Sequence, residues 1–218
     1  MLTMGVRATP PHHVMVSNVL DVLSRSTPGE VAYGREWYTD ARSHAALIAD
    51  IAGIPTDAAA GIIAVLSPQV EWTDNLREAY ELAQAWADER LPDVPGAKSY
   101  PANQAKAWAI LETPDAVGDI VRGPKVSAFW RAITGAPGGP VIDRHATRVA
   151  TGYGYSAVTE AAYYLVQQAY VDAAIMARMD VHHLQATVWL TCKRELASTV
   201  GQLSWDWGWP DRPTSFGG

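Results

Sequence analysis

Cysteine is almost absent from this chain of 218 residues, and Cys192 is its only example. A single cysteine excludes an intramolecular disulfide and any metal or iron–sulfur site built from four cysteines. It also suits the reducing cytoplasm, which we take as the expected location. Long apolar runs are missing too, because no window approaches the ~18 uninterrupted apolar residues of a membrane span. We therefore expect no membrane partner, and the first residues show no secretory signal pattern.

An excess of basic charge is also missing. The formal net charge of −6 argues against nucleic-acid binding through bulk basicity. Basic residues nevertheless gather between residues 119 and 148, where five basic and two acidic side chains give a local charge of +3. Such a group of basic residues is typical of a nucleic-acid-binding surface, but a solvated helix face also produces it by chance. Both interpretations stay open. The five basic residues are Arg122, Lys125, Arg131, Arg144 and Arg148.

Alternating strand patterns longer than a few residues are missing as well, whereas helical spacing of apolar residues runs through most of the chain. The sequence therefore predicts an all-α protein. Asp143 stands at the N-cap position of one expected helix, and proline or glycine marks the loops over residues 91–102 and 135–140. Helices are expected over residues 35–53, 55–66, 71–90, 125–134, 144–152, 156–170 and 181–197, with two shorter ones ending near residues 110 and 121.

Two side chains stand out in the segment "GPKVSAFWRAITGAPGGPVIDRHATRV". Lys125 opens an apolar helix, and Asp143 opens the next helix 18 residues later. A lysine with a lowered pKa is an amine nucleophile, and a carboxylate held at a helix N-terminus stabilises a developing sugar cation. A buried Lys–Asp ion pair is also a common structural feature, so the pair alone does not settle the chemistry.

Three blocks around this pair resemble the helix–hairpin–helix (HhH-GPD) DNA glycosylase superfamily, the group that contains endonuclease III and 8-oxoguanine glycosylase. The first is "IIAVLSPQVEWTDN" at residues 62–75. The second is "RGPKVSAFW" followed by "PVIDRHATRVA", in which Lys125 and Asp143 match the lysine and aspartate of the members with lyase activity. The third is "MDVHHLQATVWLTCKR" at residues 179–194. The blocks occur in the order of the family.

The resemblance implies a two-lobed helical fold with an active cleft between the lobes. One lobe would comprise residues 55–142, and the other residues 1–54 and 143–218. It also implies excision of a damaged or modified base from duplex DNA after nucleotide flipping, with Schiff-base chemistry at Lys125 and charge stabilisation by Asp143. The expected DNA-binding residues are Gln69 as the wedge that fills the gap, Asn75 beside it, Arg122 and Gly123 in the hairpin, and Arg144, His145 and Arg148 at phosphates.

Neither a metal nor an organic cofactor is implied. The adjacent pairs His12–His13 and His182–His183 do not suit a metal, because neighbouring helical side chains diverge by about 100°. We expect a monomer whose partner is DNA. The hairpin departs from the family pattern, since Val121 replaces its first glycine and Pro124 lacks an N–H donor. Three alternatives stay open: a base-hypermodification enzyme on the same scaffold, a catalytically silent DNA-binding protein, and a helical protein-interaction module.

Overall fold

The computed structural model describes residues 9–152 and 159–200, and within them the chain is helical and contains no strand. The predicted all-α class is therefore confirmed. The helix at residues 12–24 was not among those expected from the sequence. The elements are α1 (His12–Ser24), α2 (Pro28–Ala52), α3 (Thr56–Leu66), α4 (Trp72–Ala87), α5 (Pro101–Glu112), the 3-10 helix η1 (Pro114–Ala116), α6 (Val117–Ile120), α7 (Pro124–Thr134), α8 (Arg144–Thr151), α9 (Glu160–Ala177) and α10 (Val181–Val200).

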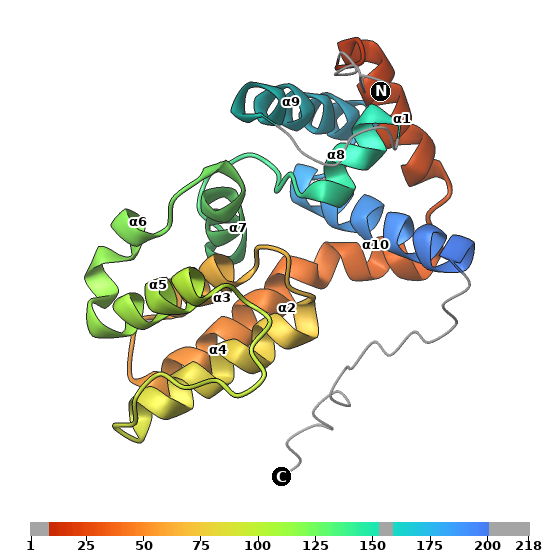
Figure 1. The fold of residues 1–218 in the computed structure, drawn as a ribbon. Coiled ribbons are helices and arrows are strands. Elements are labelled where there is room, and N and C mark those ends of the chain that lie inside the picture. Colours follow the sequence, from red (N-terminus) through yellow and green to blue (C-terminus); the bar gives the residue numbers. More distant parts are fainter. Residues whose placement is uncertain (1–8, 153–158, 201–218) are drawn as a thin grey trace, which may run out of the picture.

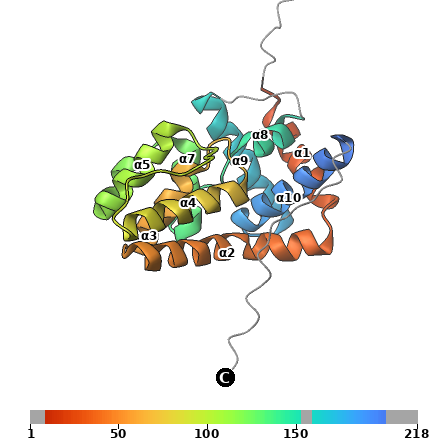
Figure 2. The ribbon, with the colours of Figure 1, turned by 60° about the horizontal axis from the view of Figure 1, so that its bottom comes forward.

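Local capping sets the limits of the long helix α2. Its N-terminus is a capping box, in which the Thr27 side chain accepts from the Glu30 backbone N–H and the Glu30 carboxylate accepts from the Thr27 N–H. The helix therefore starts seven residues before its predicted position. It ends at Gly53, which adopts the left-handed conformation with φ 69°. Figure 2 shows α2 running along the base of the molecule beneath helices from both ends of the chain.

The helix α3 is the centre of the first hydrophobic core. Every residue from Ala58 to Leu66 is buried, as the continuous apolar run predicts. Burial of each large side chain, such as Ile62, Ile63 or Leu66, stabilises the fold by roughly 1.5–3 kcal/mol. Gly61 allows the close approach of the segment around Val117, whose Cγ2 would lie 2.3 Å from a Cβ at that position.

No single helix in the described part of the chain is both long and apolar enough to cross a membrane. By length and composition alone, the pair formed by α2 and α3 passes the same test, with a bend of 111° between the two helices.

Buried side chains form two hydrophobic clusters. The first cluster combines α2 to α7 with Ala186 of α10, and the second combines α1, α8, α9 and other residues of α10. In Figure 1 these helices form two groups on opposite sides of the crossing between α2 and α10. Trp37, Ala41 and Ile48 of α2 belong to the first cluster, although the predicted division placed residues 1–54 with the second lobe. The division into lobes stays a prediction, and the buried side chains place α2 at the boundary.

The helix α7 is amphipathic, which differs from the apolar helix expected from the sequence. Phe129 and Ile133 are buried, whereas Arg131 on the same helix is exposed. Its N-cap is Gly123, with φ 91°, and Pro124 occupies its first turn. One face of α7 therefore packs on the first cluster, and Lys125 lies in the first turn.

Close packing of α2 on α10 generates a stability prediction. A Cβ on Gly34 would lie 2.2 Å from Thr187 Oγ1 and 2.8 Å from Thr187 N, so Gly34→Ala forces the helices apart. We expect a loss of about 1–3 kcal/mol in the free energy of unfolding, measured by urea denaturation followed by circular dichroism. Gly29→Ala in the same helix is the control, because the nearest atom would be 3.9 Å away. Equal stability of the two variants would contradict the close crossing.

Candidate functional site

A cavity of about 270 Å³ opens where α7 and the α3–α4 turn face α8 and α10. This volume lies near the lower end of the range of small-molecule sites. Both predicted catalytic residues line it, and the cavity draws its walls from segments that are far apart in the sequence. The lining residues are Trp37, Tyr38, Ser67, Pro68, Gln69, Val70, Glu71, Trp72, Asn75, Lys125, Phe129, Val141, Asp143, Arg144, His145, Gln185, Ala186, Trp189 and Lys193.

Lys125 reaches the cavity from the first turn of α7. Its Nζ donates to the carbonyl oxygen of Ser67 at 3.4 Å and to the Ser67 hydroxyl at 3.5 Å, and both partners are neutral. Burial of the amine lowers its pKa below the ordinary 10.5, and the negative charge of Asp143 opposes this effect only in part. The positive charge of Arg144 adds to the lowering. The site therefore favours a larger neutral fraction of this amine than of a solvated lysine.

Asp143 is held by one hydrogen bond at each oxygen. As the N-cap of α8 it accepts at Oδ1 from the Ala146 backbone N–H at 2.8 Å. Its Oδ2 accepts from the indole Nε1–H of Trp189 at 3.0 Å. These two donors orient the carboxylate, and within the described residues neither oxygen forms an ion pair with Lys125. The amine and the carboxylate thus share one cavity without neutralising each other by direct contact.

Aromatic rings form much of the cavity wall. The Trp37 ring centroid lies 5.0 Å from that of Trp72, 5.9 Å from that of Trp189 and 6.0 Å from that of Phe129. Such surfaces suit stacking against a planar heterocycle. Neither Trp72 nor Trp189 was predicted from the sequence as a site residue. A tryptophan of the hydrophobic core shows the same helical spacing. The sequence therefore contains no signal that these two tryptophans line a cavity.

Tyr38 closes one side of the cavity through a polar contact. Its hydroxyl donates to Gln185 Oε1 at 2.7 Å. Burial, together with the nearby charge of Asp143, raises the pKa of this phenol well above 10.0. Tyr38 is therefore a neutral hydrogen-bond donor across the physiological range.

Gln69, the predicted wedge, is an exposed residue of the cavity lining in the turn between α3 and α4. Its φ of 63° is in the left-handed region, which costs a non-glycine residue roughly 1–2 kcal/mol. Its side chain makes no hydrogen bond to a described residue, so the turn itself holds this conformation. The position at the cavity rim is compatible with the predicted role, which stays a prediction.

Asn75, expected beside the wedge, lines the cavity from the first turn of α4. Its side chain is fully buried, and its Nδ2 donates to the Ile63 carbonyl oxygen at 3.0 Å. This bond ties the end of α3 to the first turn of α4. Asn75 is thus a structural residue of the cavity wall. The helical spacing of the sequence does not indicate this burial, and the expected role of Asn75 beside Gln69 stays a prediction.

The other predicted DNA-binding residues separate into two groups. Arg144 and His145 line the cavity, whereas Arg122, Gly123 and Arg148 do not. Arg122 is exposed and donates to the Asp119 carboxylate at 3.1 Å. Burial lowers the pKa of His145, so this ring is largely neutral at physiological pH. The basic residues of the segment are thus spread over the surface and the cavity.

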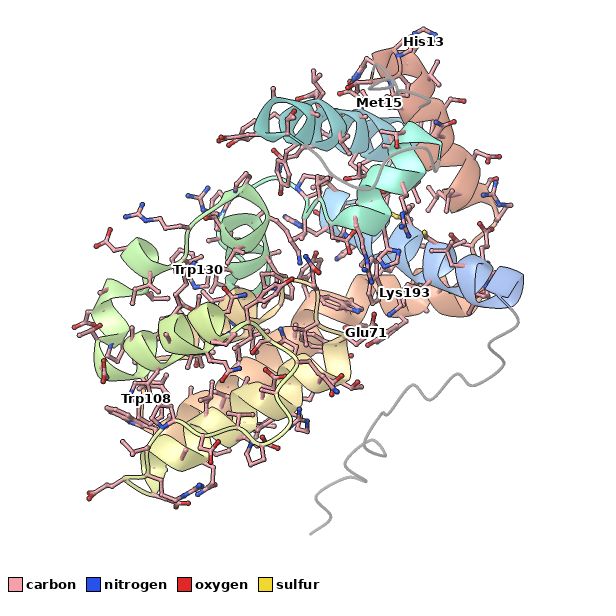
Figure 3. All side chains as sticks on the ribbon, viewed as in Figure 1. His13, Met15, Glu71, Trp108, Trp130 and Lys193 are labelled. Atoms are coloured by element: carbon pink, nitrogen blue, oxygen red, sulfur yellow. The ribbon has the colours of Figure 1, made fainter. Side chains whose placement is uncertain are left out.

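Two further residues of the site, Glu71 and Lys193, were not predicted from the sequence. Glu71, at the N-terminus of α4, accepts a hydrogen bond from Lys193 Nζ of α10 at 2.6 Å. Arg144 Nη2 lies 3.8 Å from the same carboxylate. Figure 3 shows the labelled side chains of Glu71 and Lys193 close together. The two residues are 122 positions apart in the sequence, so no local pattern indicates their contact.

Metal ligands are not grouped in the described part of the chain. Within residues 9–152 and 159–200, no three His, Cys, Asp or Glu side chains are placed to hold a metal ion.

Comparison with known proteins identifies the family. Residues 6–196 match a family model described as "Family of unknown function (DUF7178)", so the chain belongs to this family. No curated protein and no solved structure gives a significant match to the chain.

The environment of Lys125 gives a prediction about its titration. In protein reductively methylated with ¹³C, the dimethylamine signal of Lys125, assigned with Lys125→Arg, should titrate at lower pH than a dimethylated lysine in a short peptide. Asp143→Asn removes a charge that raises the pKa of Lys125, so this variant should titrate at still lower pH. Asp119→Asn, whose carboxylate pairs with Arg122, should leave the Lys125 curve unchanged. A Lys125 midpoint at or above that of the dimethylated peptide would rule out the desolvated site.

Proposed function

We propose that this member of the DUF7178 family is a DNA glycosylase that excises a damaged or modified base, with lyase activity through a Lys125 Schiff base. The observation that carries the proposal is the convergence of Lys125 and Asp143 on one cavity with aromatic walls. The cavity holds an amine with a lowered pKa beside a carboxylate that two N–H groups orient. These are the two groups that substitution at a sugar C1′ requires.

In the proposed mechanism, neutral Lys125 Nζ attacks C1′ while the glycosidic C1′–N bond breaks. The base leaves with the bonding electron pair and takes up a proton. Asp143 stabilises the positive charge that develops on the sugar ring. Loss of a proton from Nζ and cleavage of the C1′–O4′ bond then give the Schiff base. Removal of a C2′ proton expels the 3′ phosphate by β-elimination, and water releases Lys125.

The position of the cavity supports a flipped nucleotide as its occupant. Trp37, Trp72 and Phe129 line the cavity, and in this proposal the base packs against these rings while the sugar lies beside Lys125. Gln69 stands exposed at the rim, where a wedge would enter the gap in the duplex. In this proposal the fold is the two-lobed HhH-GPD fold, and the turn from Val121 to Gly123 between α6 and α7 is its hairpin.

Borohydride trapping tests the nucleophile. Incubation with an oligonucleotide that contains an abasic site, followed by reduction, should give a covalent protein–DNA adduct that denaturing electrophoresis detects. Lys125→Ala should abolish the adduct. Lys193 is the one other described lysine in the cavity lining, and it is hydrogen-bonded to Glu71. Lys106→Ala, at an exposed position on α5, is the matched control and should trap normally. An undiminished adduct in Lys125→Ala would contradict the assignment.

Base release tests the complete reaction. A panel of duplexes, each with one modified base, is assayed by mass spectrometry for free base, and Asp143→Asn should slow the release about 10²–10³-fold. A substrate that gains mass while its base is retained would indicate base hypermodification instead. Salt-dependent binding with neither adduct nor released base would indicate a silent DNA-binding protein. Either outcome would overturn the glycosylase proposal.

A further inference from the structure

The mouth of the cavity carries an ion cluster that the proposed excision chemistry does not use. Glu71 from the α3–α4 turn reaches two cations on the opposite wall, Lys193 at 2.6 Å and Arg144 at 3.8 Å. Lys193 Nζ also lies 4.8 Å from the centroid of the Trp189 ring. The same indole donates to Asp143, so the cluster is connected to the proposed catalytic carboxylate by a single side chain.

Lys193 and Arg144 hold the Glu71 carboxylate in the way that an anion-binding site holds its ligand. Partial burial raises the pKa of Glu71, but the hydrogen bond from Lys193 and the charges of Lys193 and Arg144 outweigh this effect and lower it below 4.5. Glu71 is consequently ionised at neutral pH. Lys193 and Arg144 are two cationic hydrogen-bond donors on different helices, and both are directed at one carboxylate. This arrangement matches the requirement for binding a phosphate.

The contact is also weak enough to be exchanged. The side chains of Glu71 and Arg144 are 57% and 54% exposed and that of Lys193 is 22% exposed, so water and salt screen the attraction between Glu71 and Arg144 more than that between Glu71 and Lys193. Glu71 makes no side-chain capping bond to α4, although it is the N-cap residue of that helix. Removing its carboxylate from the two cations therefore breaks no hydrogen bond of the helix start.

We propose that Lys193 and Arg144 form a phosphate-binding site at the cavity mouth, which the carboxylate of Glu71 occupies until a phosphate displaces it. The inference rests on the proposed function in one respect, because the phosphate would belong to the nucleotide whose base and sugar enter the cavity. Phosphate binding then exchanges a bond between the α3–α4 turn and α10 for a bond to the ligand. Glu71 thereby discriminates against occupants without a phosphate.

Glu71→Gln tests the exchange, because it keeps the side-chain size and removes the competing charge. The probe is a fluorescent single-stranded oligonucleotide with one stable tetrahydrofuran abasic analogue, and its affinity is measured by anisotropy. We expect about fivefold tighter binding, the order that follows from an exposed ion pair that no longer has to be broken. Glu81→Gln is the matched control, because it removes an equal charge from a carboxylate paired with Arg77 elsewhere on α4.

A double-variant comparison separates the site from general electrostatics. In a Lys193→Met background, or in an Arg144→Gln background if the first variant fails to fold, Glu71→Gln should tighten binding much less than in the unmodified chain. An equal gain in both backgrounds, or an equal gain from Glu81→Gln, would overturn the proposal. The melting temperature of Glu71→Gln should stay within about 2 °C of that of the unmodified protein.

Inorganic phosphate provides a second arm that does not depend on nucleic acid or catalysis. The indole N–H signal of Trp189 in ¹⁵N-labelled protein, assigned with Trp189→Phe, should shift during a phosphate titration. The shift should be complete at lower phosphate concentration in Glu71→Gln. A response to both probes supports a strand phosphate, and a response to inorganic phosphate alone supports a site for free phosphate. No response to either probe overturns the site. If Glu71→Gln tightens binding but no borohydride adduct forms, the glycosylase proposal is contradicted and the phosphate site is still supported.

Discussion

The close crossing of α2 and α10 is the contact on which the cavity depends. Gly34 has no side chain, so the backbone of α10 at Thr187 approaches α2 directly. From this point α2 continues into the first hydrophobic cluster, while α10 contributes Leu184 and Val188 to the second. The crossing therefore sets the separation of the two clusters. At the separation that this crossing sets, a cavity lies between α7 and the start of α8, and side chains of both helices line it.

The electrostatics of this space differ between its interior and its mouth. In the interior, desolvation outweighs the attraction of Asp143, and the pKa of Lys125 is lowered although an opposite charge lies nearby. Asp143 is satisfied by two N–H donors and does not rely on the lysine. At the mouth, the Glu71 carboxylate meets two cations in partial contact with water, where such pairs contribute little to stability. The interior thus favours a reactive amine, and the mouth favours an exchangeable ion.

The comparison of expected and observed helices shows which signals are local. The buried helix α3 was predicted correctly, because its apolar run is continuous and Pro55 precedes it. The start of α2 was missed, because the capping box of Thr27 and Glu30 lies upstream of the apolar pattern, which runs over residues 35–53. The helix α1 was missed although Met15, Val19 and Val22 follow helical spacing. In all three cases the information was present within a few residues of the boundary.

The sequence alone determined the all-α class, the N-cap role of Asp143 and the location of Lys125 in the first turn of a helix. These features depend on interactions within about one helical turn, so neighbouring residues are sufficient to specify them. Tertiary structure decided that Lys125 meets Ser67, that Trp189 holds Asp143 and that Lys193 meets Glu71. It also decided that Asn75 is buried in the cavity wall. Burial and charge environment arise from the surfaces that pack together, and those surfaces come from segments that are distant in the chain.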